Sequence, residues 1–238
     1  MKKFVILGLV VAAGAAHAQH VAYWTFDQFT TNSNSSGVGR LDSTAATFLA
    51  ANVSSSLTSS ATFNTVINSA TTNGQVGTFT GTVLSDPRAV PAATGAIVMR
   101  GTNSGSGSPI VNGQTINFLL TATGGKKINL TRVAFDYRHS STGFLTSTLS
   151  MKVNGGAATL VATGWNSTAS TFTAVSSTIA VVNATTVEFI YTFTGGTGAS
   201  GASRLDNVQM IGTVVPEPAS FVAVGIGAAL MLRRRSKK

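Results

Sequence analysis

Polar and apolar residues alternate along several segments in the middle of the chain. In Val187–Phe193 every second residue is valine or an aromatic residue, and Arg132–Arg138 and Ile116–Leu120 alternate in the same way. In Leu145–Val153 one face carries Leu, Ser, Leu, Met and Val, and the other carries Thr, Thr, Ser and Lys. Successive side chains of a strand point to opposite faces, so this period of two predicts half-buried β-strands.

Other segments extend the same prediction. Residues that favour strands, set between Gly-rich and Asn-rich stretches, predict further strands at Val21–Phe26, Thr78–Val83, Ala96–Arg100, Thr178–Val182 and Leu205–Ile211. The pair Asn154-Gly155 before Ala157–Val161 predicts a tight hairpin, because both turn residues tolerate a positive φ. About nine or ten short strands of this kind predict an all-β fold, an antiparallel β-sandwich of two packed sheets.

One segment does not follow the alternation. In Ser43–Leu57 the apolar residues Phe48, Leu49 and Val53 have helical spacing, which predicts a short helix. The high content of Ser, Thr and Ala leaves a surface loop as the alternative.

The N-terminus has the pattern of an export signal. Lys2-Lys3 precedes the apolar run Phe4–Ala16, and Ala16-His17-Ala18 has the small-x-small pattern of a cleavage site. This order is typical of a secretory signal peptide, so residues 1–18 are expected to form a signal helix that is removed. The mature protein is then expected to begin at Gln19, with one domain over residues 19–213.

The C-terminus holds a second apolar segment. Phe221–Leu232 has no polar side chain. A helix of this length rises about 18 Å, against a hydrocarbon core of about 30 Å. The segment therefore predicts a short hydrophobic helix that holds the protein at a membrane only weakly. The basic residues after it are expected to stay on the cytoplasmic side: Arg233, Arg234, Arg235, Lys237 and Lys238.

The tripeptide Pro216-Glu217-Pro218 stands just before this apolar segment. Proline fixes φ and has no N–H, so Glu217 is expected in an extended, accessible segment. In their order of Pro-Glu-Pro, apolar helix and basic stop, residues 214–238 resemble the PEP-CTERM sorting signal of exported bacterial surface proteins. The alternative is an ordinary C-terminal anchor in which Pro-Glu-Pro is only a linker.

The resemblance of the tail implies a partner and a location. The implied partner is an exosortase, an integral-membrane cysteine transpeptidase that processes such tails. The implied location is the inner membrane for the precursor, and then the cell surface or the extracellular matrix.

The net charge of +9 comes mostly from the two ends of the chain. Residues 19–213 hold nine Lys and Arg against six Asp and Glu, and their one adjacent basic pair, Lys126-Lys127, fits a solvated hairpin end. A nucleic-acid-binding domain needs a basic patch on its folded surface, so no nucleic-acid partner is expected. The chain has no cysteine, so its stability must come from a sufficient core or from a metal.

Two short motifs mark the ends of the middle segment. Trp24-Thr25-Phe26 opens it, and Leu205-Asp206-Asn207-Val208 closes it. These motifs resemble those of jelly-roll sandwiches found ahead of PEP-CTERM tails, which are similar in architecture to carbohydrate-binding modules. The resemblance implies a jelly-roll-like fold with neighbouring first and last strands, and a structural calcium held by Asp27 and Asp206.

Alternation makes a related prediction for Asp206. It places this residue on one face with Val208 and Met210, the core face, where a carboxylate must be paired, hydrogen-bonded or bound to metal. Carboxylate and carbonyl oxygens are the ligands that calcium takes. The alternatives are that Asp206-Asn207 caps a turn, or that Asp206 pairs with Arg204.

The inventory of reactive residues argues against an enzyme. After Gln19 the histidines are His20 and His139, and there is no G-x-S-x-G or H-E-x-x-H motif. No motif pairs two carboxylates, as a glycosidase would need. His139 fits a solvated strand end, and a hydrolase is the least favoured hypothesis.

The aromatic residues suggest one candidate ligand-binding residue. Trp165 lies in the loop sequence Thr163-Gly164-Trp165-Asn166, and an exposed loop tryptophan can stack on a sugar ring. The alternative is that Trp165 packs over the sheet edge, whereas Trp24 is expected in the core. The main hypothesis is therefore an exported, non-enzymatic structural or adhesive surface protein. The alternative is a carbohydrate-binding module with a polysaccharide partner.

Overall fold

The computed structural model of the chain describes residues 19–24, 46–59, 64–69, 95–100, 113–139, 146–165, 173–195 and 202–217. Twelve strands lie in these ranges: β1 (Gln19–Trp24), β2 (Phe48–Leu49), β3 (Val53–Ser59), β4 (Asn64–Ser69), β5 (Gly95–Arg100), β6 (Gln114–Ala122), β7 (Lys126–His139), β8 (Thr146–Val153), β9 (Thr159–Thr163), β10 (Thr173–Ala184), β11 (Thr186–Thr194) and β12 (Ala202–Pro216).

Several predicted segments cannot be compared with the structure. The signal helix of residues 1–18, the apolar segment Phe221–Leu232 and the strand Thr78–Val83 all lie outside the described residues. Within the described ranges, no helix is long and apolar enough to cross a membrane.

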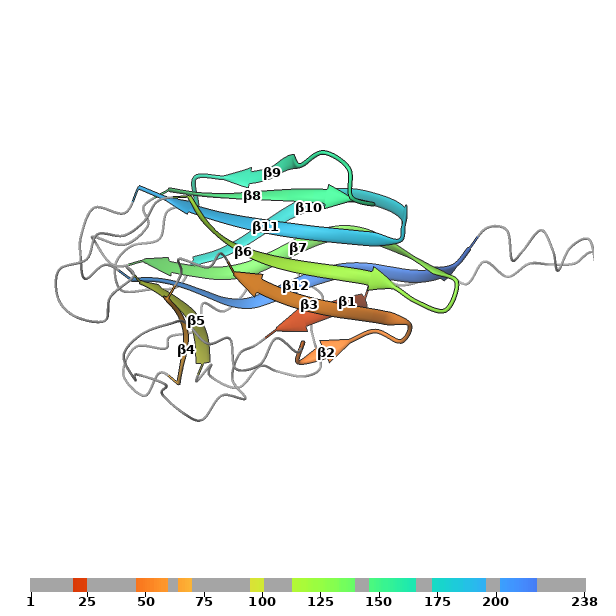
Figure 1. The fold of residues 1–238 in the computed structure, drawn as a ribbon, viewed down its shortest axis with the longest axis horizontal. Coiled ribbons are helices and arrows are strands. Elements are labelled where there is room, and N and C mark those ends of the chain that lie inside the picture. The colour runs from red at the N-terminus through yellow and green to blue at the C-terminus, as the bar shows by residue number, and fades with distance from the viewer. Residues whose placement is uncertain are drawn as a thin grey trace, which may run out of the picture.

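The strands form two antiparallel sheets. Sheet A has seven strands in the order β10-β7-β12-β1-β2, with β5 paired to β12 and β4 paired to β5. Sheet B has five strands in the order β3-β6-β11-β8-β9. The longer strands run along the long axis of the molecule, and the chain passes from β6 in sheet B to β7 in sheet A and back to β8 (Figure 1). The predicted all-β fold with two antiparallel sheets is confirmed.

The core lies between the two sheets and is built from the alternating apolar positions. In β11 the alternate residues of Val187–Phe193 are fully buried, while the residues between them are partly exposed. Trp24 of β1 and Phe118 of β6 meet edge to face, with ring centroids 4.9 Å apart. Burying each such side chain contributes about 1.5–3 kcal/mol. The predicted aromatic stripe of β11 and the core position of Trp24 are confirmed.

The segment Ser43–Leu57 is not a helix where the structure describes it. Phe48–Leu49 forms β2 beside β1, and β3 pairs with β6 at the edge of sheet B. Val53 and Leu57 are buried on one face of β3, because a spacing of four fits a strand as well as a helix. A turn at Asn52, with a φ of 63°, separates the two strands. Both the predicted helix and the alternative surface loop are therefore wrong for these strands.

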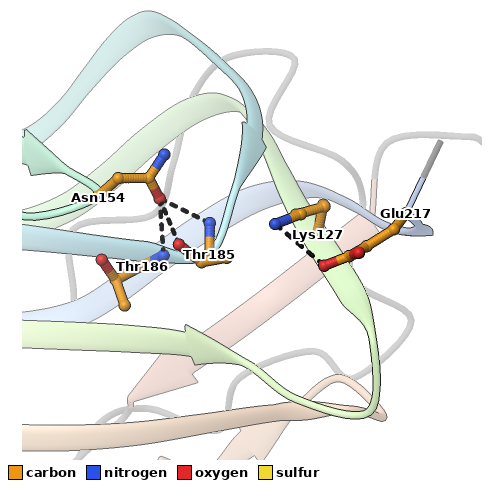
Figure 2. A network of polar contacts seen from close by, with 5 residues as sticks. All are labelled: Lys127, Asn154, Thr185, Thr186 and Glu217. Atoms are coloured by element: carbon orange, nitrogen blue, oxygen red, sulfur yellow. Dashed lines mark hydrogen bonds and ion pairs between the residues drawn. The ribbon is translucent and has the colours of Figure 1, made fainter. Parts of the chain in front are cut away.

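The predicted hairpin at Asn154-Gly155 is confirmed. These residues have φ of 52° and 70° and join β8 to β9. Asn154 Oδ1 accepts hydrogen bonds from the N–H of Thr185 at 2.7 Å, the Thr185 hydroxyl at 2.7 Å and the N–H of Thr186 at 3.1 Å (Figure 2). This turn is thereby tied to the turn between β10 and β11 at the same end of the sandwich.

The last strand continues past residue 213, the domain end expected from the sequence. Val214, Val215 and Pro216 pair with Ile128, Lys127 and Lys126 of β7. The sandwich is therefore directly continuous with the first residue of the Pro-Glu-Pro tripeptide.

Candidate functional site

A pair of buried carboxyl groups lies on the outer face of sheet A, away from the core. Asp206 of β12 is directly opposite Asp136 of β7. The side chains are 1% and 0% exposed, respectively. The neighbouring pair, Leu205 and Tyr137, points into the core, so the two aspartates point the other way.

A β-bulge explains why the predicted face of Asp206 is wrong. Asp206 pairs with Asp136 and Gln209 pairs with Ala134, so Asn207 and Val208 together oppose one residue. Asn207 has a φ of 49°, a conformation that asparagine tolerates better than most residues. Because of this extra residue, Val208 lies in the core while Asp206 lies on the opposite face.

Asn207 links the two carboxyl groups. Its N–H donates to Asp206 Oδ1 at 2.7 Å, and its Nδ2 donates to Asp136 Oδ2 at 2.8 Å. Tyr23 of β1 donates from its hydroxyl to Asn207 Oδ1 at 3.2 Å. Asp136 Oδ1 is buried and has no hydrogen-bond partner among the residues that the structure describes. A buried acceptor left in this way is costly unless a proton or a cation occupies it.

The polar cluster continues along β1 and β12. His20 Nε2 lies 3.0 Å from Gln209 Oε1, and since Oε1 can only accept, the imidazole is the donor. The His20 ring stacks on Tyr23 with centroids 5.5 Å apart. We call these buried side chains the outer cluster: His20, Tyr23, Asp136, Asp206, Asn207 and Gln209.

The electrostatics of the outer cluster disfavour two ionised carboxylates. Burial raises the pKa of Asp136 from 3.8 to about 7, although the hydrogen bond from Asn207 acts in the opposite direction. A second carboxyl group directly across the strand pair adds like-charge repulsion when both are ionised. The pair is therefore compatible with one retained proton or with a bound cation.

The donors fit calcium in type but supply few ligands. Asp136 and Asp206 offer the carboxylate oxygens that calcium prefers. Within the described ranges, no group of three or more His, Cys, Asp or Glu could hold a metal ion. Asp27, the partner that the family resemblance implies, lies outside those ranges. The structure brings Asp206 together with Asp136 instead, and an Asp27–Asp206 site stays a prediction.

Sequence reasoning missed Asp136 as a member of this site. The available signal was weak: Asp136 is the one acidic residue in the predicted strand Arg132–Arg138 and lies on its polar face. Only the register of β7 against the bulged β12 brings it opposite Asp206.

Trp165 is part of the core. Its side chain is 7% exposed and packs edge to face on Phe135, with centroids 4.9 Å apart. The ring also lies near Tyr137 and Tyr191, at 6.1 and 6.4 Å. The hypothesis of an exposed ring is therefore wrong. The indole is packed, as the alternative expected, but within the aromatic cluster between the sheets rather than over a sheet edge.

His139 is buried rather than solvated. It is 8% exposed and lies beside Tyr137, with ring centroids 6.1 Å apart. The Tyr137 hydroxyl donates to Ser203 Oγ at 3.2 Å and accepts from the Ser147 hydroxyl at 3.3 Å. Since Ser147 belongs to sheet B and Ser203 to sheet A, Tyr137 is a polar link between the sheets.

The outer face of sheet B is lined mostly by hydroxyl groups. We call it the hydroxyl face. Its members are partly or fully exposed, and those of β3, β6, β8 and β11 alternate with the core residues: Ser54, Ser56, Thr58, Thr115, Asn117, Leu119, Thr121, Thr146, Thr148, Ser150, Lys152, Thr186, Glu188, Ile190, Thr192 and Thr194, with Leu160 and Thr163 of β9 opposite Ser150 and Thr148. The two charged members neutralise each other, since Lys152 Nζ is 3.3 Å from Glu188 Oε2. Asn117 Nδ2 donates to Glu188 Oε1 at 3.1 Å.

A row of threonines crosses the hydroxyl face. Thr115, Thr192, Thr148 and Thr163 are successive partners on β6, β11, β8 and β9. Neighbouring strands lie about 4.8 Å apart, so the row spans roughly 14 Å. It presents evenly spaced hydroxyl groups that both donate and accept hydrogen bonds.

Of the predicted sorting motif, the structure describes Pro216 and Glu217. The Glu217 N–H donates to the Gly125 carbonyl at 3.2 Å, and its carboxylate lies 3.1 Å from Lys127 Nζ (Figure 2). Lys127 is thus ion-paired rather than only solvated. Pro218 and the basic stop Arg233–Arg235 lie outside the described residues.

Comparisons with known proteins give only distant likenesses. No family model and no curated protein matches the chain. Among solved structures it is similar to TmCBM61 in complex with β-1,4-galactotriose, at 10% identity and TM-score 0.39, over 67% of this chain and 88% of that one. It is also similar to the CBM22-1 xylan-binding domain from Paenibacillus barcinonensis Xyn10C, at 10% identity and TM-score 0.36, over 84% and 96% of the two chains.

A third likeness is to the CBM22-1 and GH10 modules of a Clostridium thermocellum endo-1,4-β-D-xylanase. The identity is 13% and the TM-score 0.39, over 82% of this chain and 28% of that one. With TM-scores this low, the fold assignment rests on the strand pairing described above.

Proposed function

We propose that this chain is an exported, non-enzymatic protein whose sandwich binds an uncharged polysaccharide on the hydroxyl face of sheet B. The observation that carries the proposal is the row of threonines from Thr115 to Thr163 across four strands. Sugars present hydroxyl groups, and threonine hydroxyls can donate to them and accept from them.

The charge of the hydroxyl face supports an uncharged ligand. Its one described cation, Lys152, is paired with its one described anion, Glu188. A polyanion or a polycation would find no complementary net charge there. Leu119 and Ile190 are partly exposed near the centre of the face and offer apolar contacts to the C–H groups of a sugar ring.

The absence of catalysis is part of the proposal. A glycosidase needs two carboxylates flanking the scissile bond in a cleft. The paired carboxyl groups Asp136 and Asp206 are 0% and 1% exposed, so they offer no access to a polymer. We therefore propose that these two residues have a structural role rather than a catalytic one.

Delivery and sorting are proposed from the two ends of the sequence. Residues 1–18 direct export, and the tail from Pro216 to Arg235 directs the precursor to the inner membrane, where an exosortase processes it for the cell surface or the matrix. The intact mass of the native product tests this directly. It should begin at Gln19 and lack the basic stop, and a product that keeps Met1 would exclude export through this signal.

A glycan array tests the binding proposal. The folded protein should be retained by one or more neutral polysaccharides, and retention should persist at high salt because no net charge is involved. Retention by charged glycans alone, lost at high salt, would contradict it.

A further inference from the structure

The folded sandwich holds the residue at the centre of the predicted sorting motif. The strand pairing of β12 with β7 continues through Val215 opposite Lys127 and Pro216 opposite Lys126. Beyond the strand, the Glu217 N–H donates to the Gly125 carbonyl at 3.2 Å. The Glu217 carboxylate then pairs with Lys127 Nζ at 3.1 Å, as Figure 2 shows.

These contacts engage two of the groups by which Glu217 can be recognised, its backbone N–H and its carboxylate. An enzyme that binds an extended peptide pairs with its backbone N–H and C=O groups and reads its side chains. In the folded chain, the Glu217 N–H and carboxylate are already bound to the β6–β7 turn and to the start of β7. Pro216, the last residue of β12, has no N–H. Glu217 is the next residue, and its N–H is the first backbone donor beyond the strand.

We propose that Lys127 is a positioning residue that holds Glu217 against the sandwich and so restrains processing of the tail. The inference rests on the proposed sorting function. A processing enzyme then binds the motif only after the end of β12 has separated from Gly125 and Lys127. Folding of the exported domain thereby slows release of the tail.

The expected effect is modest because the ion pair is partly solvated. The side chains of Lys127 and Glu217 are 20% and 40% exposed. Ion pairs at such positions are weak, so their loss should raise the population of the separated state by about two- to fivefold.

The test compares Lys127→Ala with Lys152→Ala in a host that carries the processing enzyme. Lys152 is a matched control, because it forms an ion pair of similar length, 3.3 Å, with Glu188 away from the tail. Pulse-chase labelling should show the precursor of Lys127→Ala converted about two- to fivefold faster than wild type. Lys152→Ala should match wild type, and Lys127→Arg should restore the wild-type rate.

A second readout does not depend on processing. Hydrogen exchange of the purified precursor should speed up at the Glu217 amide in Lys127→Ala and stay unchanged in Lys152→Ala. Wild-type or slower processing of Lys127→Ala, while Glu217→Ala blocks processing, would overturn the restraint alone. Normal processing of Glu217→Ala would instead overturn the sorting function, and the restraint with it.

Discussion

Asp136 and Asp206 lie directly opposite each other on β7 and β12, with both carboxyl groups buried and with Asn207 hydrogen-bonded to each. The β-bulge at Asn207 and Val208 also turns Asp206 away from the core. The outer cluster is therefore a product of strand register. Its protonation and its response to cations are measurable.

The raised pKa of Asp136 predicts that the free energy of unfolding depends on pH. Its pKa is about 7 in the folded chain against an ordinary value of 3.8. Below about pH 4 both states are protonated, and as pH rises towards 7 only the unfolded state loses its proton, so the contribution of Asp136 is lost. In chelator, the melting temperature of wild type should fall between pH 5 and pH 8 more than that of Asp136→Asn. If the two proteins differ by about 2 kcal/mol in the free energy of unfolding that they lose over this range, the falls in their melting temperatures should differ by roughly 4–8 °C. Equal slopes for the two proteins would refute the retained proton.

Calcium should reverse that loss if the outer cluster binds it. Binding to the folded state alone stabilises by roughly 2.7 kcal/mol at a hundredfold excess over the dissociation constant. Added calcium should raise the melting temperature of wild type at pH 8, and Asp136→Asn and Asp206→Asn should each abolish the increase. Glu188→Gln removes a carboxylate outside the cluster and should keep it. Melting curves that are identical in calcium and in chelator would exclude the site.

The core offers a matched pair of tyrosine substitutions. Tyr191 has a buried hydroxyl with no hydrogen-bond partner within the described ranges, whereas the Tyr137 hydroxyl bonds to Ser147 and Ser203. Tyr191→Phe should leave the free energy of unfolding unchanged or raise it by about 1 kcal/mol. Tyr137→Phe should lower it by about 1–2 kcal/mol because two hydroxyl groups lose their partner. Denaturant midpoints measure both. An equal cost for the two changes would mean that Tyr191 has a partner, such as a bound water.

The sequence predicted the fold class and much of the core because alternation is a local signal. The stripe in Val187–Phe193 and the hairpin at Asn154-Gly155 needed no knowledge of distant residues. The strand β3 was missed because its buried Val53 and Leu57 also have helical spacing. Pairing with β6 decides between the two structures, and sequence position does not encode that pairing.

The candidate site was less predictable for the same reason. One extra residue at Asn207 reverses the face of Asp206, and no composition signal marks a bulge. Trp165 follows a glycine in a polar sequence, which suggests exposure, yet Phe135 from the other sheet packs on it. The threonine row emerged only when the registers of β6, β11, β8 and β9 were known.

The most direct test of the account is the affinity of a hydroxyl-face variant for the glycan that the array identifies. Thr192 lies at the centre of the threonine row, whereas Thr178 is exposed on the outer face of sheet A, opposite Arg132. Thr192→Glu should weaken binding about tenfold or more, which corresponds to roughly 1.4 kcal/mol, because it brings an unpaired charge to the bound sugar. Thr178→Glu, the same change on the other sheet, should bind as wild type does, and both melting temperatures should stay near that of wild type. Unchanged affinity in Thr192→Glu would contradict polysaccharide binding on the hydroxyl face.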